Sequence, residues 1–154
     1  MNLDEPRAGA SILSDAAELP LGTIQAWIRD GIVPLAAADV DAHGSGSRRQ
    51  FTLRTALRFA IAGALVRGGV HHRTASEWAA RFTDSGFGAT QTNSDSRNPG
   101  ELFEGNDQTL LVIKDGLPRV MRSSSFDARP SGHHASTVLN LNPIVDRVTA
   151  RLVG

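Results

Sequence analysis

Apolar residues recur at helical spacing in the first half of the chain, in segments interrupted by glycine and proline. This pattern predicts four helices. They cover Ser11–Leu19, Gly22–Asp30, Leu53–Gly68 and Thr74–Phe82. Pro20 should end the first of them, because proline disfavours helical backbone at the residue before it. We therefore expect a small helical unit over residues 11–82.

The second predicted helix has two unlike faces. Ile24, Trp27 and Ile28 share one face, and we expect them in the core. The other face carries Gly22, Gln25, Ala26 and Arg29. Gly31 is placed to adopt the left-handed conformation that follows many helices, and Pro34 prevents the helix from continuing. This helix should therefore stand on the core with a small, polar outer face.

Between the second and third helices, residues 36–50 have no helical pattern. Their centre reads HGSGSRRQ, a Gly/Ser turn followed by two arginines, which predicts a β-hairpin. Phe51 follows as an apolar anchor at the base of the hairpin. Thr52 is a favoured residue type at a helix N-terminus and should cap the third helix.

The composition and the apolar pattern change twice in the second half of the chain. Residues 83–108 are rich in Gly, Ser, Thr, Asn and Asp and lack periodicity, which predicts a flexible linker. Two apolar strands follow, Leu110–Ile113 and Leu117–Met121, around the hairpin signal Asp115-Gly116. A third strand is expected over Ser136–Leu141.

The last predicted helix begins at Asn142-Pro143, where Asn142 should cap the helix and proline suits its first turn. It runs to about Leu152 with an apolar face. We therefore expect residues 109–154 to form a small β-β-β-α module that serves dimerisation or sensing. The predicted fold class is α+β, mainly α.

Composition excludes several classes of protein. The 154 residues include no cysteine, which removes disulfides and thiolate metal sites. No apolar run is long enough to span a bilayer, and the N-terminus does not resemble a secretory signal, so a cytoplasmic protein is expected. The net charge is zero, but seven arginines and one acid lie between Ser45 and Phe82. A locally basic stretch of this kind suits contact with phosphate, although it equally fits a solvated helix surface.

The sequence offers little for catalysis or metal binding. Adjacent residues of a helix point in different directions, so the pairs His71-His72 and His133-His134 are poor chelators. Ser123–Ser125, Asp127 and His133 include the residue types of a hydrolase triad but no nucleophile elbow. We expect no enzyme, no metal and no cofactor.

The stretch LPLGTIQAWIRDGIVPL resembles the recognition helix and its exit turn in the MerR family of bacterial transcription regulators. The likeness continues in the Gly-rich turn Gly44–Gly46, Arg49, Phe51 and Thr52, and then in Gly69-Val70 and Trp78. Gly22 and Ala26 stand where the family usually has an arginine and a tyrosine that contact DNA. No coiled coil follows Phe82, where the family usually has one.

This resemblance implies a winged helix-turn-helix domain over residues 11–82. It implies a dimeric, nucleoid-associated regulator that binds double-stranded DNA by sequence, with an effector that the sequence does not identify. The expected DNA contacts are Thr23, Gln25, Arg29, Ser47, Arg48, Arg49, Arg54 and Arg58. Two other hypotheses stay open: an excisionase-like protein that bends DNA, and a ligand sensor or small enzyme that its DNA-binding domain targets.

Overall fold

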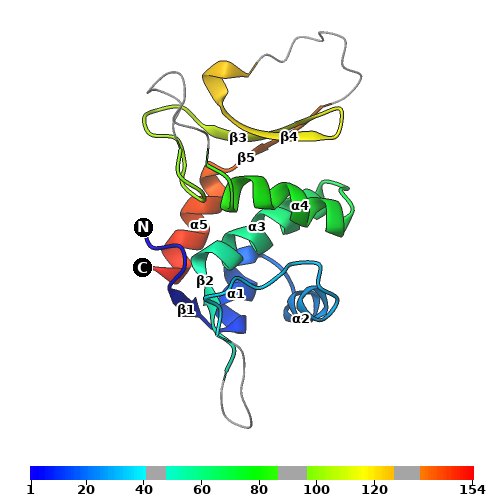
Figure 1. The fold of residues 1–154 in the computed structure, drawn as a ribbon, viewed down its shortest axis with the longest axis vertical. Coiled ribbons are helices and arrows are strands. Elements are labelled where there is room, and N and C mark those ends of the chain that lie inside the picture. Colours follow the sequence, from blue (N-terminus) through cyan, green and yellow to red (C-terminus); the bar gives the residue numbers. More distant parts are fainter. Residues whose placement is uncertain (41–47, 87–96, 127–135) are drawn as a thin grey trace.

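The structure is a computed structural model of residues 1–154, and it describes residues 1–40, 48–86, 97–126 and 136–154 (Figure 1). The fold is α+β, as predicted. Its helices are α1 (Ala10–Ala17), α2 (Leu21–Arg29), α3 (Leu53–Arg67), α4 (His72–Thr83), the 3-10 helix η1 (Ser123–Ser125) and α5 (Asn142–Leu152). Its strands are β1 (Pro6–Ala8), β2 (Phe51–Thr52), β3 (Thr109–Lys114), β4 (Leu117–Arg122) and β5 (Ser136–Asn140). None of the described helices is both long and apolar enough to cross a membrane.

Short-range sequence signals correctly predicted how α3 begins and how α2 ends. The Thr52 side chain accepts a hydrogen bond from the Thr55 amide at 3.2 Å, so the predicted cap of α3 is confirmed. Gly31 has the expected left-handed backbone (φ 64°) after α2. The end of α1 differs from the prediction, because Glu18 itself is left-handed (φ 53°) and closes the helix before Pro20. The Leu19 amide then donates to the Ser14 carbonyl, which completes the turn.

Helix α3 is the centre of the molecule. Its side chains are buried on nearly every side, among them Leu57, Phe59 and Ile61. Its side chains are covered on several sides because α1, α4 and α5 all pack against this helix. Several of the small residues that lie between its large ones are also buried, and they let these neighbours approach closely.

Two short strands were not predicted. β1 pairs antiparallel with β2 and so joins the start of the chain to the start of α3. Just before β2, Val40 and Gln50 form an antiparallel bridge, with paired hydrogen bonds of 3.0 and 2.9 Å. This bridge is the base of the predicted hairpin. The expected turn Gly44–Gly46 lies outside the described residues, as does Ser47.

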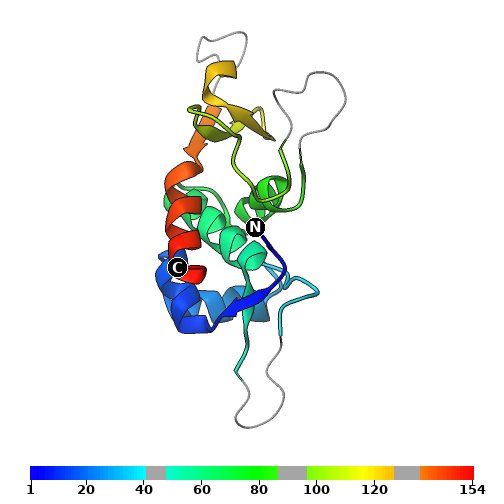
Figure 2. The same cartoon turned by 90° about the vertical axis from the view of Figure 1, so that its left-hand side faces the viewer.

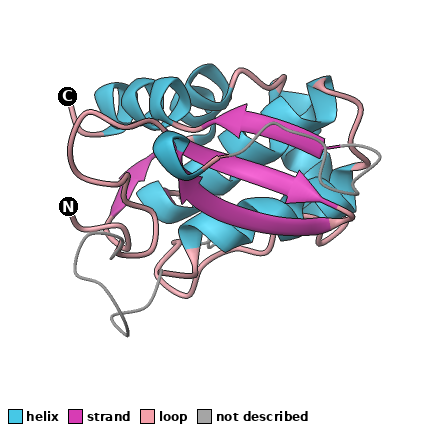
Figure 3. Ribbon diagram, turned by 90° about the horizontal axis from the view of Figure 1, so that it is seen from above, coloured by secondary structure: helices cyan, strands magenta, loops and turns pink. Residues whose placement is uncertain are grey.

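The second sheet has the strand order β4-β3-β5 and is antiparallel throughout. Asp115 and Gly116 both have positive φ (50° and 76°), which confirms the predicted two-residue hairpin turn between β3 and β4. Figure 3 shows this sheet lying across the helices beneath it. Leu111 and Ile113 project from β3 into the same apolar core that contains α3.

Residues 109–154 do not form the separate module that the sequence predicted. On α5, Ile144, Val145 and Val148 belong to the core shared with α1 and α3. The Arg147 Nε atom donates to the Ala16 carbonyl at 3.0 Å, and its guanidinium pairs with Glu18 at 3.2 Å. The C-terminal helix is therefore part of the first domain's core.

The linker prediction is also wrong for the residues that the structure describes. Within 83–108, Arg97 and Phe103 are buried, and the Gly100 amide donates to the Phe82 carbonyl at 2.7 Å. The polar composition of residues 83–108 predicted a mobile segment. In the structure, however, polar groups of this segment form hydrogen bonds with backbone atoms. Asn142 likewise departs from its predicted role, because its Oδ1 accepts from the Thr109 amide at 2.7 Å and not from its own helix.

Candidate nucleic-acid interface

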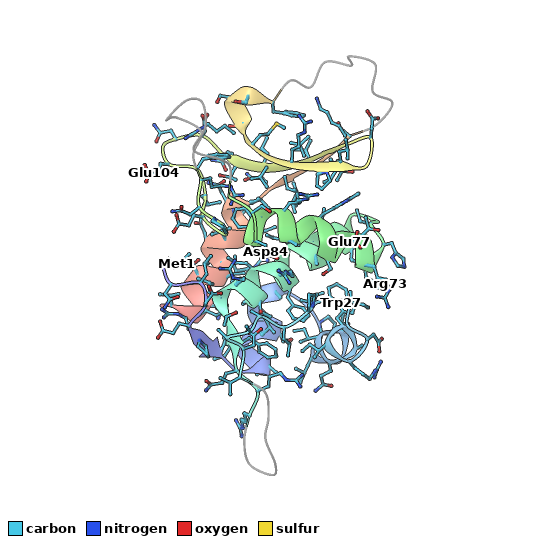
Figure 4. All side chains as sticks on the ribbon, in the orientation of Figure 1. Met1, Trp27, Arg73, Glu77, Asp84 and Glu104 are labelled. Atoms are coloured by element: carbon cyan, nitrogen blue, oxygen red, sulfur yellow. The ribbon has the colours of Figure 1, made fainter. Side chains whose placement is uncertain are left out.

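Helices α1 and α2 are joined by three residues, 18–20, and α2 is held firmly on its inner side. Ile24 is fully buried and Trp27 is only 7% exposed. The Trp27 ring stacks on Phe59 of α3 (centroids 6.2 Å apart, 11° between planes) and lies 6.5 Å from the His72 ring of α4. Figure 4 shows Trp27 between α2 and the helices above it. Its predicted place in the core is confirmed.

The outer face of α2 is open to solvent. Gly22, Gln25 and Arg29 are exposed, and Thr23 is half-buried at its edge. The Arg29 side chain is 74% exposed, and its Nε donates to the Asp30 carboxylate at 2.9 Å. This hydrogen bond raises the pKa of Arg29 and lowers the pKa of Asp30. An ion pair so exposed to water is weak, so a phosphate or a base can replace Asp30 as the partner of Arg29.

The chain that returns toward α3 passes the same end of the molecule. Arg48 is exposed and Arg49 is half-buried on the approach to Gln50. Asp39 anchors this region, because its carboxylate accepts from the Ala36 amide (2.5 Å), the Thr52 amide (2.6 Å) and the Thr55 hydroxyl (2.6 Å). The sequence analysis missed Asp39, whose role depends on partners up to 16 residues away.

Figure 1 shows α2 and β2, which directly follows Gln50, in the lower half of the molecule and the sheet β4-β3-β5 at the upper end. Figure 2 shows the same separation from the side. The exposed residues Gln25, Arg29 and Arg48 therefore lie at one end, away from the C-terminal sheet.

Arg54, expected on the DNA-facing surface, instead ties the N-terminal segment to α3. Its guanidinium binds both carboxylate oxygens of Asp4, at 2.6 and 2.9 Å, and it also donates to the Thr83 carbonyl. The pKa of Asp4 is lowered and the pKa of Arg54 is raised, in both cases chiefly by this hydrogen bond. Two internal partners already hold the guanidinium, so the structure does not support the prediction that Arg54 contacts DNA.

Arg58 is further from solvent still, at 8% exposure. It pairs with Asp84 at the end of α4 and donates to the Pro34 carbonyl at 3.4 Å. Of the remaining basic residues in this stretch, Arg67 pairs with Glu18 at 3.4 Å. The seven arginines between Ser45 and Phe82 therefore do not share one phosphate-facing surface.

The candidate metal and catalytic residues do not assemble a site among the described residues. His71 and His72 have ring centroids 4.1 Å apart, but the described chain contains no group of three potential metal ligands. Ser123–Ser125 form the short helix η1, whereas Asp127 and His133-His134 lie outside the described residues.

No protein-family model matches this chain, and no curated protein is significantly similar to it. Its function must therefore be inferred from the geometry of α2 and the residues around it.

Proposed function

We propose that this chain binds double-stranded DNA and acts as a sequence-specific transcription regulator. In the proposed complex, α2 enters the major groove and residues 48–50 lie along the phosphate backbone. The observation that carries the proposal is α2 itself, which is anchored by Ile24 and Trp27 and presents Gln25 and Arg29 on its exposed outer face. The likeness of residues 19–35 to the MerR recognition helix supports the same function.

The dimensions of α2 suit this role. Its nine residues make a helix about 13 Å long, and the major groove is about 12 Å wide. Gln25 and Arg29 are four residues apart, so they lie one above the other on the exposed face. Glutamine can bind the edge of adenine with two hydrogen bonds, and arginine can bind guanine in the same way. These two side chains are the proposed readers of sequence.

Arg48 is the proposed phosphate contact beside the groove, since it is exposed at the same end of the molecule as α2. Contacts to phosphate fix the position of a protein on DNA without selecting a sequence. With a net charge of zero, the chain has no general attraction to nucleic acid. Binding should therefore depend on a few local contacts.

Selection from a random duplex pool, followed by fluorescence anisotropy on the enriched site, tests this proposal. Gln25→Ala should cost about 1–3 kcal/mol at one base pair, and it should change the preferred base there. Arg48→Ala should weaken binding to all duplexes and reduce the slope of log K against log salt by about one. Arg151→Ala is the matched control, because Arg151 is an exposed arginine on α5.

Failure of the wild-type chain to enrich any duplex would overturn the proposal. Equal losses for Arg48→Ala and Arg151→Ala would remove Arg48 from the interface. An unchanged preferred site for Gln25→Ala would exclude Gln25 from base recognition.

The structure weakens the expectation of a dimer built on residues 109–154. That expectation needed a sheet with an uncovered apolar face, yet β3 is buried on both faces, with Leu111 and Ile113 on one and Leu110 and Val112 on the other. The sheet also lies at the opposite end from α2, so pairing through it would hold two α2 helices far apart (Figure 1).

We therefore expect sedimentation velocity of the full chain at micromolar concentration to give a monomer. The control is Leu117→Ser, which removes the most exposed large apolar side chain of the sheet (64% exposed) and should leave the sedimentation coefficient unchanged. A wild-type dimer that this substitution dissociates would restore the sheet as the interface.

A further inference from the structure

A cavity of about 430 Å³ lies between the C-terminal end of α4 and the edge strand β4. Figure 1 shows β4 passing over α4 at the upper end of the molecule, away from α2. Four arginines line the cavity, Arg81, Arg97, Arg119 and Arg122, and the apolar side chains at its wall include Phe103 and Val120. Among the described residues that line it, none is acidic. A cavity of this size matches those that enclose small organic ligands.

Arg97 gives the cavity a buried positive charge. The residue is 7% exposed, and its guanidinium donates to backbone carbonyls, including those of Phe82 (3.1 Å) and Ser85 (2.5 Å). These carbonyls lie at the end of α4, so Arg97 caps that helix. Its Nε has no hydrogen-bond partner within the described chain. Burial lowers the pKa of Arg97 to about 10, and the field of Glu101 only partly opposes this, so the group stays charged at neutral pH.

The other arginines surround this charge. Arg122 lies over the Phe103 ring, with its guanidinium carbon 4.8 Å from the ring centroid, and donates to the Glu104 carbonyl at 2.7 Å. Arg81 and Arg119 are exposed and line the cavity, and Arg119 on the edge strand β4 also lines a hollow on the outer face of the sheet. Neither of their side chains forms an ion pair within the described part of the chain. The two guanidinium groups are therefore available to a ligand.

We infer that this cavity binds a small organic anion. The apolar body of the ligand lies against Phe103 and Val120, and its acidic group pairs with Arg81 and Arg119. An anion also offsets the charge of Arg97, which has carbonyl partners but no carboxylate bonded to it. A neutral apolar ligand would leave Arg81 and Arg119 without a counter-charge, whereas Arg122 already lies 3.8 Å from the Asp107 carboxylate. A bare inorganic anion would leave the apolar wall in contact with water.

This inference does not rest on the proposed DNA binding. None of the described residues that line the cavity belongs to α2, and Figure 1 shows β4 above α4 and α2 below it. The two sites do share α4, whose end lines the cavity and whose first residue, His72, stacks on Trp27 of α2. Ligand binding is nevertheless measured on the protein alone, so its failure and the failure of DNA binding are separate results.

Titration of the full chain with 8-anilinonaphthalene-1-sulfonate, followed by its fluorescence, tests the inference. This probe has an aromatic body and one acidic group. N-phenyl-1-naphthylamine has the same body without the sulfonate and serves as the neutral comparison. The wild-type chain should bind one sulfonate probe per molecule, with an affinity that falls as salt rises.

The double variant Arg81→Gln/Arg119→Gln should weaken sulfonate binding by about tenfold or more while leaving the neutral probe unaffected. Arg73→Gln is the matched control, because Arg73 is an exposed arginine at the opposite end of α4 (Figure 4). Ser85→Trp places a large ring at an exposed lining position and should exclude both probes.

Three results would overturn the inference. They are wild-type affinity in the double variant, an equal loss in Arg73→Gln, and an equal loss of the neutral probe in the double variant. The last result would mean that the probe reports an apolar surface without a site for the acid. Both exposed arginines are free of described internal partners, so circular dichroism should show all of these glutamine variants folded.

Discussion

A chain that ends after Gly86 should not fold, although it retains every residue of the predicted helical domain. The truncation removes Leu141, Ile144, Val145 and Val148, four buried side chains that pack in the core with α1 and α3. Burial of each is worth about 1.5–3 kcal/mol, so the loss is about 6–12 kcal/mol. The whole stability of a domain of this size is about 5–15 kcal/mol.

Far-UV circular dichroism and thermal melting measure this effect. The full chain should melt cooperatively, and the truncated chain should show little helix and no transition. Removal of Val153 and Gly154 alone is the control, since both residues are exposed and should leave the melting temperature nearly unchanged. A cooperative transition in the chain ending at Gly86 would instead show that residues 11–82 fold on their own.

The sequence did not predict that the helical domain needs α5, because the contacts involved join residues that are far apart in the chain. The helices were predictable because their apolar spacing, the Thr52 cap and Gly31 act within a turn or two of chain. The hairpin turn Asp115-Gly116 is just as local. The docking of α5 joins residues far apart, as in the hydrogen bond of Arg147 to Ala16 across 131 positions. Nothing in the pattern of α5 specifies which surface its apolar face covers.

The same difference between local and long-range interactions explains which residues of the candidate site were predicted correctly from the sequence. The outer face of α2 followed from its amphipathic pattern, and the structure leaves Gln25 and Arg29 exposed. Arg54 and Arg58 lie one turn apart on α3, and the sequence analysis expected both to contact DNA. Their partners Asp4 and Asp84 lie 50 and 26 residues away and bring both guanidinium groups inward.

Arg97 was missed for a related reason. It lies in a segment whose Gly, Ser and Asn content predicts a mobile linker, and no sequence motif marks an arginine that will cap a helix 15 residues earlier. The role of Arg97 depends on the folded structure, in which the carbonyl groups at the end of α4 lie around its guanidinium.

Trp27→Ala should destabilise the protein by about 3–5 kcal/mol, because it removes a large buried ring from between three helices. The ring joins α2 to Phe59 of α3 and to His72 of α4, so its loss leaves a cavity at the point where α2 is held. Trp27→Phe keeps an aromatic ring there and should cost less, about 1–2 kcal/mol. Urea unfolding followed by circular dichroism gives both values, with Gln25→Ala as the exposed control on the same helix, expected within about 0.5 kcal/mol of the wild type.

The Phe variant also separates the two roles that a tryptophan in this helix can have. A core residue acts on DNA only by positioning α2, so Trp27→Phe should remain folded and retain duplex affinity within about threefold. A tryptophan that stacks on a base contributes about 1–3 kcal/mol directly, and its replacement would then weaken binding at little cost in stability. If the Trp27→Phe protein loses affinity for DNA but unfolds at the same urea concentration as the wild type, Trp27 contacts DNA directly. Because Trp27 is only 7% exposed, we expect the opposite result: a measurable loss of stability with binding retained.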